Sequence, residues 1–461
     1  MHKLDELVAS MNFHDQKAFV NYLRSPYFTS NSLLETLFRE VTRRVVSEKK
    51  PESALVSLPA VKRKALTAQK LRYLQTDLVR HLEYFFTLRH LDRQSLQLDV
   101  IKLQALSERD CEKSWSYIHS ELTGNTTLRN FDFHLTGFAV AENRAKFLSA
   151  KLSRKKAPEF ENVMYHLDAF YFSKKLQLFC EMINMKNLIA NEAELTFFNE
   201  VKSQAVQFME EPAVKIYYSI LLTLTEPDNE SHFTHARSVI TALGKLFPAK
   251  ELNEIFFYIK NYCIRKINKG KPEYMVVLFE IYKEIISNKR LMSLDYLSQF
   301  EFKNIVSLSL RLKENEWCKE FIGKRIALLP PGDRDNSFAY NTAYLNFMTG
   351  NYKNAVRLLQ EVEFTDVVYQ LDARVILLKC YFEMDDEETF FYHASAFRLF
   401  LLRNRHISDY QKTINRNLIR HLVAIMRNRH SIARMKKVKA AILKDLNVAD
   451  VKWLMEKLDL Y

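Results

Sequence analysis

The sequence predicts an all-α fold, built as an α-solenoid of stacked antiparallel helical hairpins. Only 7 glycines and 10 prolines occur in 461 residues, so the chain lacks most of the turn residues that a β-rich fold needs. Hydrophobic residues make up 48% of the chain, which is enough to form a continuous core. A pattern of helix, turn and helix also recurs every 35 residues, at Asn315, Gly350 and Asp385. Such hairpins bury their apolar faces only by stacking on one another.

Residues 1–47 are predicted to form an N-terminal cap of short helices. Ser25-Pro26 ends the second of them, because proline removes a hydrogen-bond donor and disfavours helix in the residue before it. Asn31 or Ser32 can cap a third helix that runs through Val45. Residues 48–60 contain two prolines and no apolar periodicity, so we expect a loop or linker there.

Residues 61–295 are predicted to form irregular helical hairpins. The longest helical pattern runs from Val61 to Leu91, and a helix of that length needs a partner to cover its apolar stripe. Turns are expected at Gly124-Asn125, Ala157-Pro158 and Lys269-Gly270-Lys271-Pro272. Between such breaks, helices are expected at 96–106, 111–122, 131–152, 161–189, 195–209, 213–224, 233–247, 252–267 and 274–286.

Residues 296–404 contain the three aligned repeat units. In the second unit, Gly350 opens a tight turn, Tyr352 packs across it, and the small Ala343 and Ala355 let two helices approach. This unit resembles a tetratricopeptide repeat, and the resemblance implies a right-handed superhelix that binds a partner protein along its concave surface. The aligned apolar columns are Leu308, Ala343 and Leu378; Leu310, Leu345 and Cys380; Leu312, Phe347 and Phe382; and Phe321, Val356 and Phe391.

The other two units depart from the family pattern. The third has Asp385 at the turn and Phe390 in place of Ala355, and the first is aligned with Glu320 in that place. The whole chain is also similar to an uncharacterised group of bacterial helical-repeat proteins with a Ser-Pro-Tyr-Phe-like box, here Ser25 to Phe28. That similarity implies no function.

Residues 405–461 are predicted to form a basic C-terminal helical cap. Residues 401–461 contain 14 Lys and Arg against 5 Asp and Glu, so this region supplies most of the net charge of +13. Helical spacing predicts that Ile414, Leu418 and Ile425 pack inward, as do Ile432, Met435, Val438 and Ile442 of the next helix. The cations predicted to point outward, where they could bind an anionic partner, are Lys412, Arg416, Arg420, Arg427, Arg434, Lys437 and Lys444.

Two explanations for this charge remain open. A repeat array needs a polar end cap to shield its last apolar face, and cations can serve that purpose. Between Arg403 and Lys444, however, twelve cations face one acid, which favours a partner such as nucleic-acid phosphates, an acidic protein segment or anionic lipid. Aromatic residues are sparse there (Tyr410 and Trp453), which argues against base stacking.

Catalytic and cofactor motifs are missing from the sequence. No two glycines lie close enough for a dinucleotide or phosphate loop, and no Gly-x-Ser-x-Gly, His-Glu-x-x-His or Cys-x-x-Cys pattern occurs. His232 and His235 are three residues apart, but they lack further metal ligands. The acidic run from Asp385 to Glu388 is more simply a helix N-terminus than a cation site. We therefore expect no cofactor and no metal.

The expected function is that of a non-enzymatic scaffold that binds another protein along the solenoid surface. The alternative is a nucleic-acid-associated regulator that uses the basic C-terminal helices. Asn341 and Asn346 are candidate contacts on the concave surface, because first helices of hairpins usually line that side. Five dispersed cysteines and an N-terminus without a signal-like apolar run lead us to expect a cytoplasmic protein without a transmembrane segment.

Overall fold

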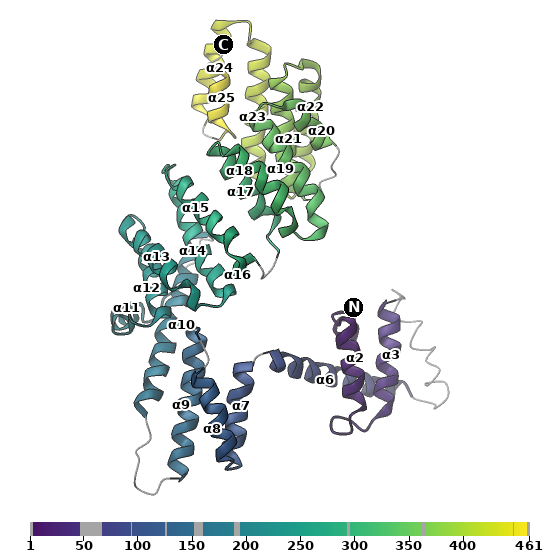
Figure 1. Ribbon diagram of the computed structural model, residues 1–461. Helices are drawn as coiled ribbons and strands as arrows, with labels where there is room; N and C mark the ends of the chain where they lie inside the picture. The colour runs from purple at the N-terminus through teal and green to yellow at the C-terminus, as the bar shows by residue number, and fades with distance from the viewer. Residues whose placement is uncertain are drawn as a thin grey trace. The chain divides into compact units, whose positions relative to one another are not determined.

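In the computed structural model, every regular element among the described residues is helical (Figure 1). The structure describes residues 3–46, 67–93, 95–124, 127–151, 160–188, 194–292, 296–360, 366–445 and 447–458. The all-α prediction is therefore confirmed for this part of the chain, whereas the predicted linker at 48–60 and the Ala157-Pro158 break lie outside it. The chain divides into two compact units, Met1–Gln177 with Phe197–Lys215, and Leu178–Thr196 with Ile216–Tyr461.

The first unit begins with short helices that pack on one long helix. Leu78, Leu82 and Phe85 of the long helix α6 are buried in a core shared with α1, α2 and α3, as the apolar stripe in the sequence predicts. The helices of this unit are α1 (Lys3–Ala9), α2 (Phe13–Arg24), α3 (Ser32–Val46), α6 (Ala68–Arg93), α7 (Ser95–Glu108), α8 (Glu112–Gly124), α9 (Phe131–Lys151), the first part of α10 (Phe160–Leu188), α11 (Phe198–Gln204) and the 3₁₀ helix η1 (Ala205–Phe208).

The second unit contains the end of α10 and the remaining helices, and most of these helices pair with the next one along the chain. They are α12 (Pro212–Thr225), α13 (Glu230–Leu243), η2 (Gly244–Leu246), α14 (Ala249–Asn268), α15 (Tyr274–Ser287), α16 (Lys289–Met292), α17 (Gln299–Arg311), α18 (Asn315–Arg325), η3 (Ile326–Leu328), η4 (Pro331–Asp333), α19 (Arg334–Met348), α20 (Tyr352–Gln360), α21 (Val367–Glu383), α22 (Glu387–Arg403), α23 (Asp409–Asn428), α24 (Ile432–Lys444) and α25 (Val451–Leu458). The first residues of α12 belong to the first unit.

Five hairpins share one kind of turn. After α7, α14, α17, α19 and α21 the chain enters the left-handed region at Asp110, Gly270, Lys313, Gly350 and Asp385, with φ between 54° and 84°. In each case the next residue donates its N–H to the carbonyl five residues earlier, at 2.8 to 3.1 Å. This is the Schellman arrangement, which satisfies carbonyls at a helix end. Only two of the five positions are glycine, so glycine spacing alone does not identify the turn.

The shared turn corrects the alignment of the first repeat unit. The second helices of the three units begin at Asn315, Tyr352 and Glu387, so the spacing is 37 residues and then 35. The period of 35 is right for the second step and wrong for the first. Cys318, not Glu320, therefore matches Ala355 and Phe390, and all three of these side chains are fully buried. Glu320 is exposed.

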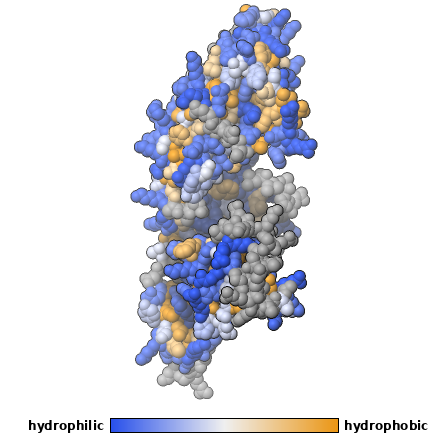
Figure 2. All heavy atoms as spheres, turned by 90° about the vertical axis from the view of Figure 1, so that its right-hand side faces the viewer, coloured by the Kyte–Doolittle hydropathy of each residue, from blue (hydrophilic) through white to orange (hydrophobic). Residues whose placement is uncertain are grey.

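Successive hairpins of the second unit pack in a row. From α17 onward, α17, α19 and α21 each contact their own second helix and the next first helix, so α17, α19, α21 and α23 lie side by side (Figure 1). One core cluster is shared by α19, α20 and α21, and another by α21 through α25. On the face drawn in Figure 2, hydrophobic patches are scattered among hydrophilic atoms. No helix in the described ranges is long and apolar enough to span a bilayer.

Candidate functional site

The basic helices α23 and α24 present both paired and unpaired cations. Ser408 caps α23 by accepting a hydrogen bond from the N–H of Gln411 at 3.2 Å, and α24 packs against α23. Leu418 and Ile425 are buried and Ile414 is half-buried, much as the spacing predicts. On α24, Met435, Val438 and Ile442 are buried.

Ile432 is the exception to the predicted inward stripe. Its side chain is 70% exposed, because it occupies the first position of α24, where the chain has only just left the turn. Leu443 at the other end of α24 is also exposed. The cationic surface of this helix therefore carries two apolar side chains.

One of the predicted anion-binding cations, Arg420, already has an acidic partner. Arg420 pairs with Asp445, whose carboxylate also lies 2.9 Å from Nε2 of His421. Arg427 is exposed but lies 5.4 Å from the ring centre of Phe391. Arg429, a basic residue outside the predicted set, pairs with Asp385 and lies 3.4 Å from Glu387. These contacts show why a count of cations overstates the charge available to a partner.

Other predicted cations are exposed and have no acidic partner among the described residues. Arg416, Arg434, Lys437 and Lys444 belong to this group, whereas Lys412 is half-buried. Eleven residues separate Arg416 from Arg427 on α23, which corresponds to about 16 Å along a helix. The charge is thus spread along the helices and not focused in a pocket.

The first-helix face, formed by α17, α19 and α21, contains a polar cluster. Lys303 of α17 pairs with Asp372 of α21, and its ammonium lies 5.6 Å and 5.4 Å from the ring centres of Tyr340 and Tyr369. The hydroxyl of Tyr369 donates to the carbonyl of Gln299 at 2.9 Å. Burial raises the pKa of Tyr369 to about 12 and raises the pKa of Tyr340 well above its usual value, and the carboxylate of Asp372 adds to both shifts. The cluster therefore joins the first helices of three successive units.

The structure corrects the expectation that Asn341 is a surface contact. Its side chain is fully buried, and its Nδ2 donates to the carbonyl of Ser337 one turn earlier at 2.7 Å. Asn346 is half-buried and makes the same kind of bond to Thr342 at 2.8 Å. Both amides turn back onto their own helix because a donor at i can reach the carbonyl at i−4. Asn341 therefore cannot contact a partner in this conformation.

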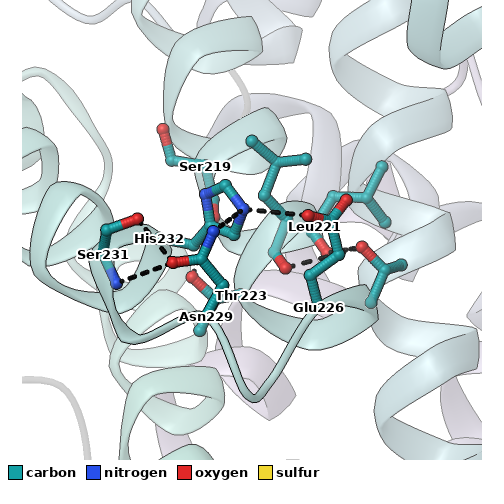
Figure 3. Close-up of polar contacts among 9 residues, drawn as sticks. Ser219, Leu221, Thr223, Glu226, Asn229, Ser231 and His232 are labelled. Carbon is teal, nitrogen blue, oxygen red and sulfur yellow. Dashed lines mark hydrogen bonds and ion pairs between the residues drawn. The ribbon is translucent and has the colours of Figure 1, made fainter.

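The two weak metal candidates have structural roles. Nε2 of His232 lies 3.0 Å from Glu226 and 3.1 Å from Nδ2 of Asn229, the residue that caps α13 (Figure 3). His235 is exposed. Asp386 caps α22 by accepting from the N–H of Thr389 at 3.1 Å, so the acidic run marks a helix N-terminus as predicted. Within the described ranges, no group of three or more His, Cys, Asp or Glu is arranged to hold a metal.

The contact between the buried His134 and the half-buried His166 in the first unit was not predicted from the sequence. Nδ1 of His134 lies 3.4 Å from Nδ1 of His166, and Nε2 of His134 lies 3.0 Å from Oε2 of Glu211. Tyr165 donates to the other oxygen of Glu211. Gly137 allows this packing, since a Cβ there would lie 2.6 Å from the ring of His166. Only the missing side chain at Gly137 could have hinted at it.

Four of the five cysteines are buried, as expected, and Cys111 is exposed; all five are free thiols. Burial raises the pKa of Cys263 and of Cys380 to about 12, so neither is poised as a thiolate nucleophile.

Comparison with known proteins returned no match, whether to a family model, to a curated protein or to a solved structure.

Proposed function

We propose that the chain is a binding scaffold whose residues 296–404 form tetratricopeptide-like hairpins in a right-handed α-solenoid, and that it binds a partner protein along the first-helix face. The observation that carries this proposal is the row of side-by-side first helices, in which α17, α19 and α21 each end in the same kind of left-handed turn. Such a row gives an extended surface to which several repeats contribute side chains. We propose a cytoplasmic location and no catalytic role.

The charged cluster on the first-helix face supports this surface as the binding side. The ion pair between Lys303 and Asp372 links α17 to α21, and we expect it to restrict their relative motion before a partner arrives. A rigid surface loses less entropy on binding than one that must first be ordered. Exposed polar side chains on α17, such as Asn304 and Arg311, are available for contacts.

Crosslinking followed by affinity purification of the full-length protein tests this proposal. Asn304→Arg combined with Arg311→Glu should reduce recovery of the partner at least tenfold, because both changes alter the first-helix face. Lys353→Glu is the matched control, since Lys353 is exposed on the second helix α20. Equal loss in both variants, or loss in neither, would contradict binding on the first-helix face.

Nucleic-acid binding by α23 and α24 is the second candidate, favoured by the exposed cations without acidic partners. Binding of a labelled DNA duplex should weaken steeply with salt, and each phosphate contact contributes about 0.9 to the slope of log K against log salt. Reversing Arg416, Arg434, Lys437 and Lys444 to Glu should remove that binding. Arg420 is left unchanged because Asp445 already neutralises it. Duplex binding that persists in the variant would exclude this surface.

A further inference from the structure

The last helix, α25, packs on the first-helix face. Trp453 contacts Phe382 of α21 edge to face, with ring centres 5.8 Å apart, and it packs against both C-terminal core clusters. The ammonium of Lys379 lies 4.8 Å from the ring of Trp453 and 5.8 Å from that of Phe347 on α19. An eight-residue helix therefore covers part of the surface proposed above for a partner.

Opposite charges hold α25 at both ends of this contact. Nζ of Lys379 lies 2.5 Å from Oδ2 of Asp450, which immediately precedes α25. Nζ of Lys457 lies 2.5 Å from Oε1 of Glu383, one turn after Lys379 on α21. Asp450, Trp453 and Lys457 thus contact three side chains of α21. Asp450 pairs with the base Lys379, Trp453 contacts the ring of Phe382, and Lys457 pairs with the acid Glu383.

Burial of the receiving side chains restricts which occupants the face accepts. Lys379 is only 7% exposed, and the side chain of Glu383 is 13% exposed. These exposures are those with α25 in place. A buried charge without a partner is costly, so a segment that covers these two side chains as α25 does must bring a carboxylate to Lys379 and a cation to Glu383. Asp450 also lies near Tyr344. Burial is the largest cause that raises the pKa of Tyr344; the charge of Arg311 lowers this pKa and the charge of Asp450 raises it.

The attachment of α25 is short and local. The preceding loop is held by Asn417, which donates to the carbonyl of Asn447 at 2.7 Å, and by the N–H of Ala449, which donates to the carbonyl of Ile414 at 3.2 Å. Within α25, Leu454 and Leu458 are buried. A helix of two turns is not stable alone in water, so these contacts keep it folded.

We propose that α25 occupies in cis a peptide-binding surface formed by α19 and α21. The partner this surface fits is a helical protein segment with an acidic residue, an aromatic residue three positions later and a basic residue four positions after that. Such a segment displaces α25 by taking over its contacts with Lys379, Phe382 and Glu383. The inference rests on the proposed scaffold function and adds to it the chemistry of the partner and its regulation.

The loop that joins α25 to α24 determines how strongly α25 competes with a free segment for this surface. A short flexible linker holds a ligand at an effective concentration of the order of 1 mM, so a free segment of equal intrinsic affinity competes poorly at micromolar concentration. Weakening the contacts of α25 within the chain should therefore increase the affinity for a free segment. The surface itself must stay intact in such a variant.

The test measures binding of a fluorescent peptide with the sequence of residues 447–458. The double variant Asp450→Lys, Lys457→Glu loses both end contacts of α25 but keeps Lys379 and Glu383, so it should bind this peptide at least tenfold more tightly than the wild-type chain. Adding Lys379→Glu should abolish the gain. A peptide with both charges reversed should not bind the double variant. Circular dichroism and thermal unfolding establish that each variant is folded.

Equal peptide affinity in the wild-type chain and the double variant would overturn the proposal, as would a gain that survives Lys379→Glu. If the double variant does not fold, hydrogen exchange on the wild-type chain decides the matter: excess peptide should speed exchange of the α25 amides, and unchanged exchange would refute displacement. The partner purification described above does not depend on this peptide. Partner capture that succeeds while the peptide test fails would therefore leave the scaffold and remove only the role of α25.

Discussion

Lys313 should be a weak point in the first repeat hairpin, and replacing it by glycine should stabilise the protein. Its φ of 62° lies in the left-handed region, where a side chain costs about 1 to 2 kcal/mol because Cβ approaches the following carbonyl. Glycine removes this cost but loses about 0.5 to 1 kcal/mol more through chain entropy on folding. The exposed Lys313 side chain contributes little packing. The net gain for Lys313→Gly is therefore about 1 kcal/mol.

The same reasoning predicts the opposite sign at Gly350, where φ is 80°. A Cβ there would meet no atom within 4 Å, so Gly350→Ala should cost about 1 kcal/mol through the backbone alone. Lys313→Ala is the control, because it removes the side chain but keeps the strained conformation. For a unit of this size, 1 kcal/mol corresponds to a shift in Tm of about 2 °C.

Calorimetry of the three variants decides the matter. We expect a higher Tm for Lys313→Gly, a lower one for Gly350→Ala and almost no change for Lys313→Ala. If Lys313→Gly and Lys313→Ala behave alike, then Lys313 is not the structural counterpart of Gly350.

Three further outcomes are expected. Asp386→Ala should destabilise the second unit by about 1 kcal/mol in urea unfolding, because α22 loses its N-cap, whereas Asp386→Asn should retain most of the stability. Asn341→Leu should change the free energy of unfolding by less than about 1 kcal/mol, because Oδ1 of Asn341 is buried without a described partner and an apolar side chain of similar size removes that cost. A larger loss of stability would show that the amide of Asn341 stabilises the fold. Burial and the neighbouring His134 lower the pKa of His166 in the folded chain below its ordinary value of 6.5. As the pH falls, the unfolded chain therefore takes up a proton at this histidine before the folded chain does. The free energy of unfolding that His166 contributes above pH 6.5 is then lost at lower pH. Thermal unfolding of His166→Phe between pH 5 and 8 should show a smaller loss at low pH than the wild-type chain, and an unchanged pH dependence would exclude His166 as its source.

The helices themselves could be predicted because their signal is local. Apolar residues repeat every three to four positions, and proline, glycine and acidic caps mark the ends. The predicted helix at 274–286 is thus α15, Tyr274–Ser287. The turn after α17 could not be predicted, because Lys313 adopts a conformation that the surrounding hydrogen bonds impose and its own side chain does not favour.

The side-chain contacts of the candidate site could not be predicted from the sequence pattern. Helical spacing correctly placed Arg416 and Lys437 outside, but not the pairing of Arg420 with Asp445. Asn341 was expected at the surface because its side chain is polar, yet it is satisfied by its own helix and buried. The pairing of His134 with Glu211 joins residues far apart in the chain, so their positions in the sequence contain no sign of it.

The five Schellman turns also bear on how sequences of this architecture diverge. Two main-chain hydrogen bonds define each turn, and aspartate, glycine and lysine all occupy the left-handed position. Because the net penalty for a non-glycine residue, after the chain entropy of glycine is subtracted, is only about 1 kcal/mol, mutation can change the residue at this position while the geometry persists. Related chains of this kind would then keep the same sequence intervals between their left-handed residues, even where the residues themselves differ. A search keyed to those intervals could detect homologues that residue-by-residue comparison overlooks.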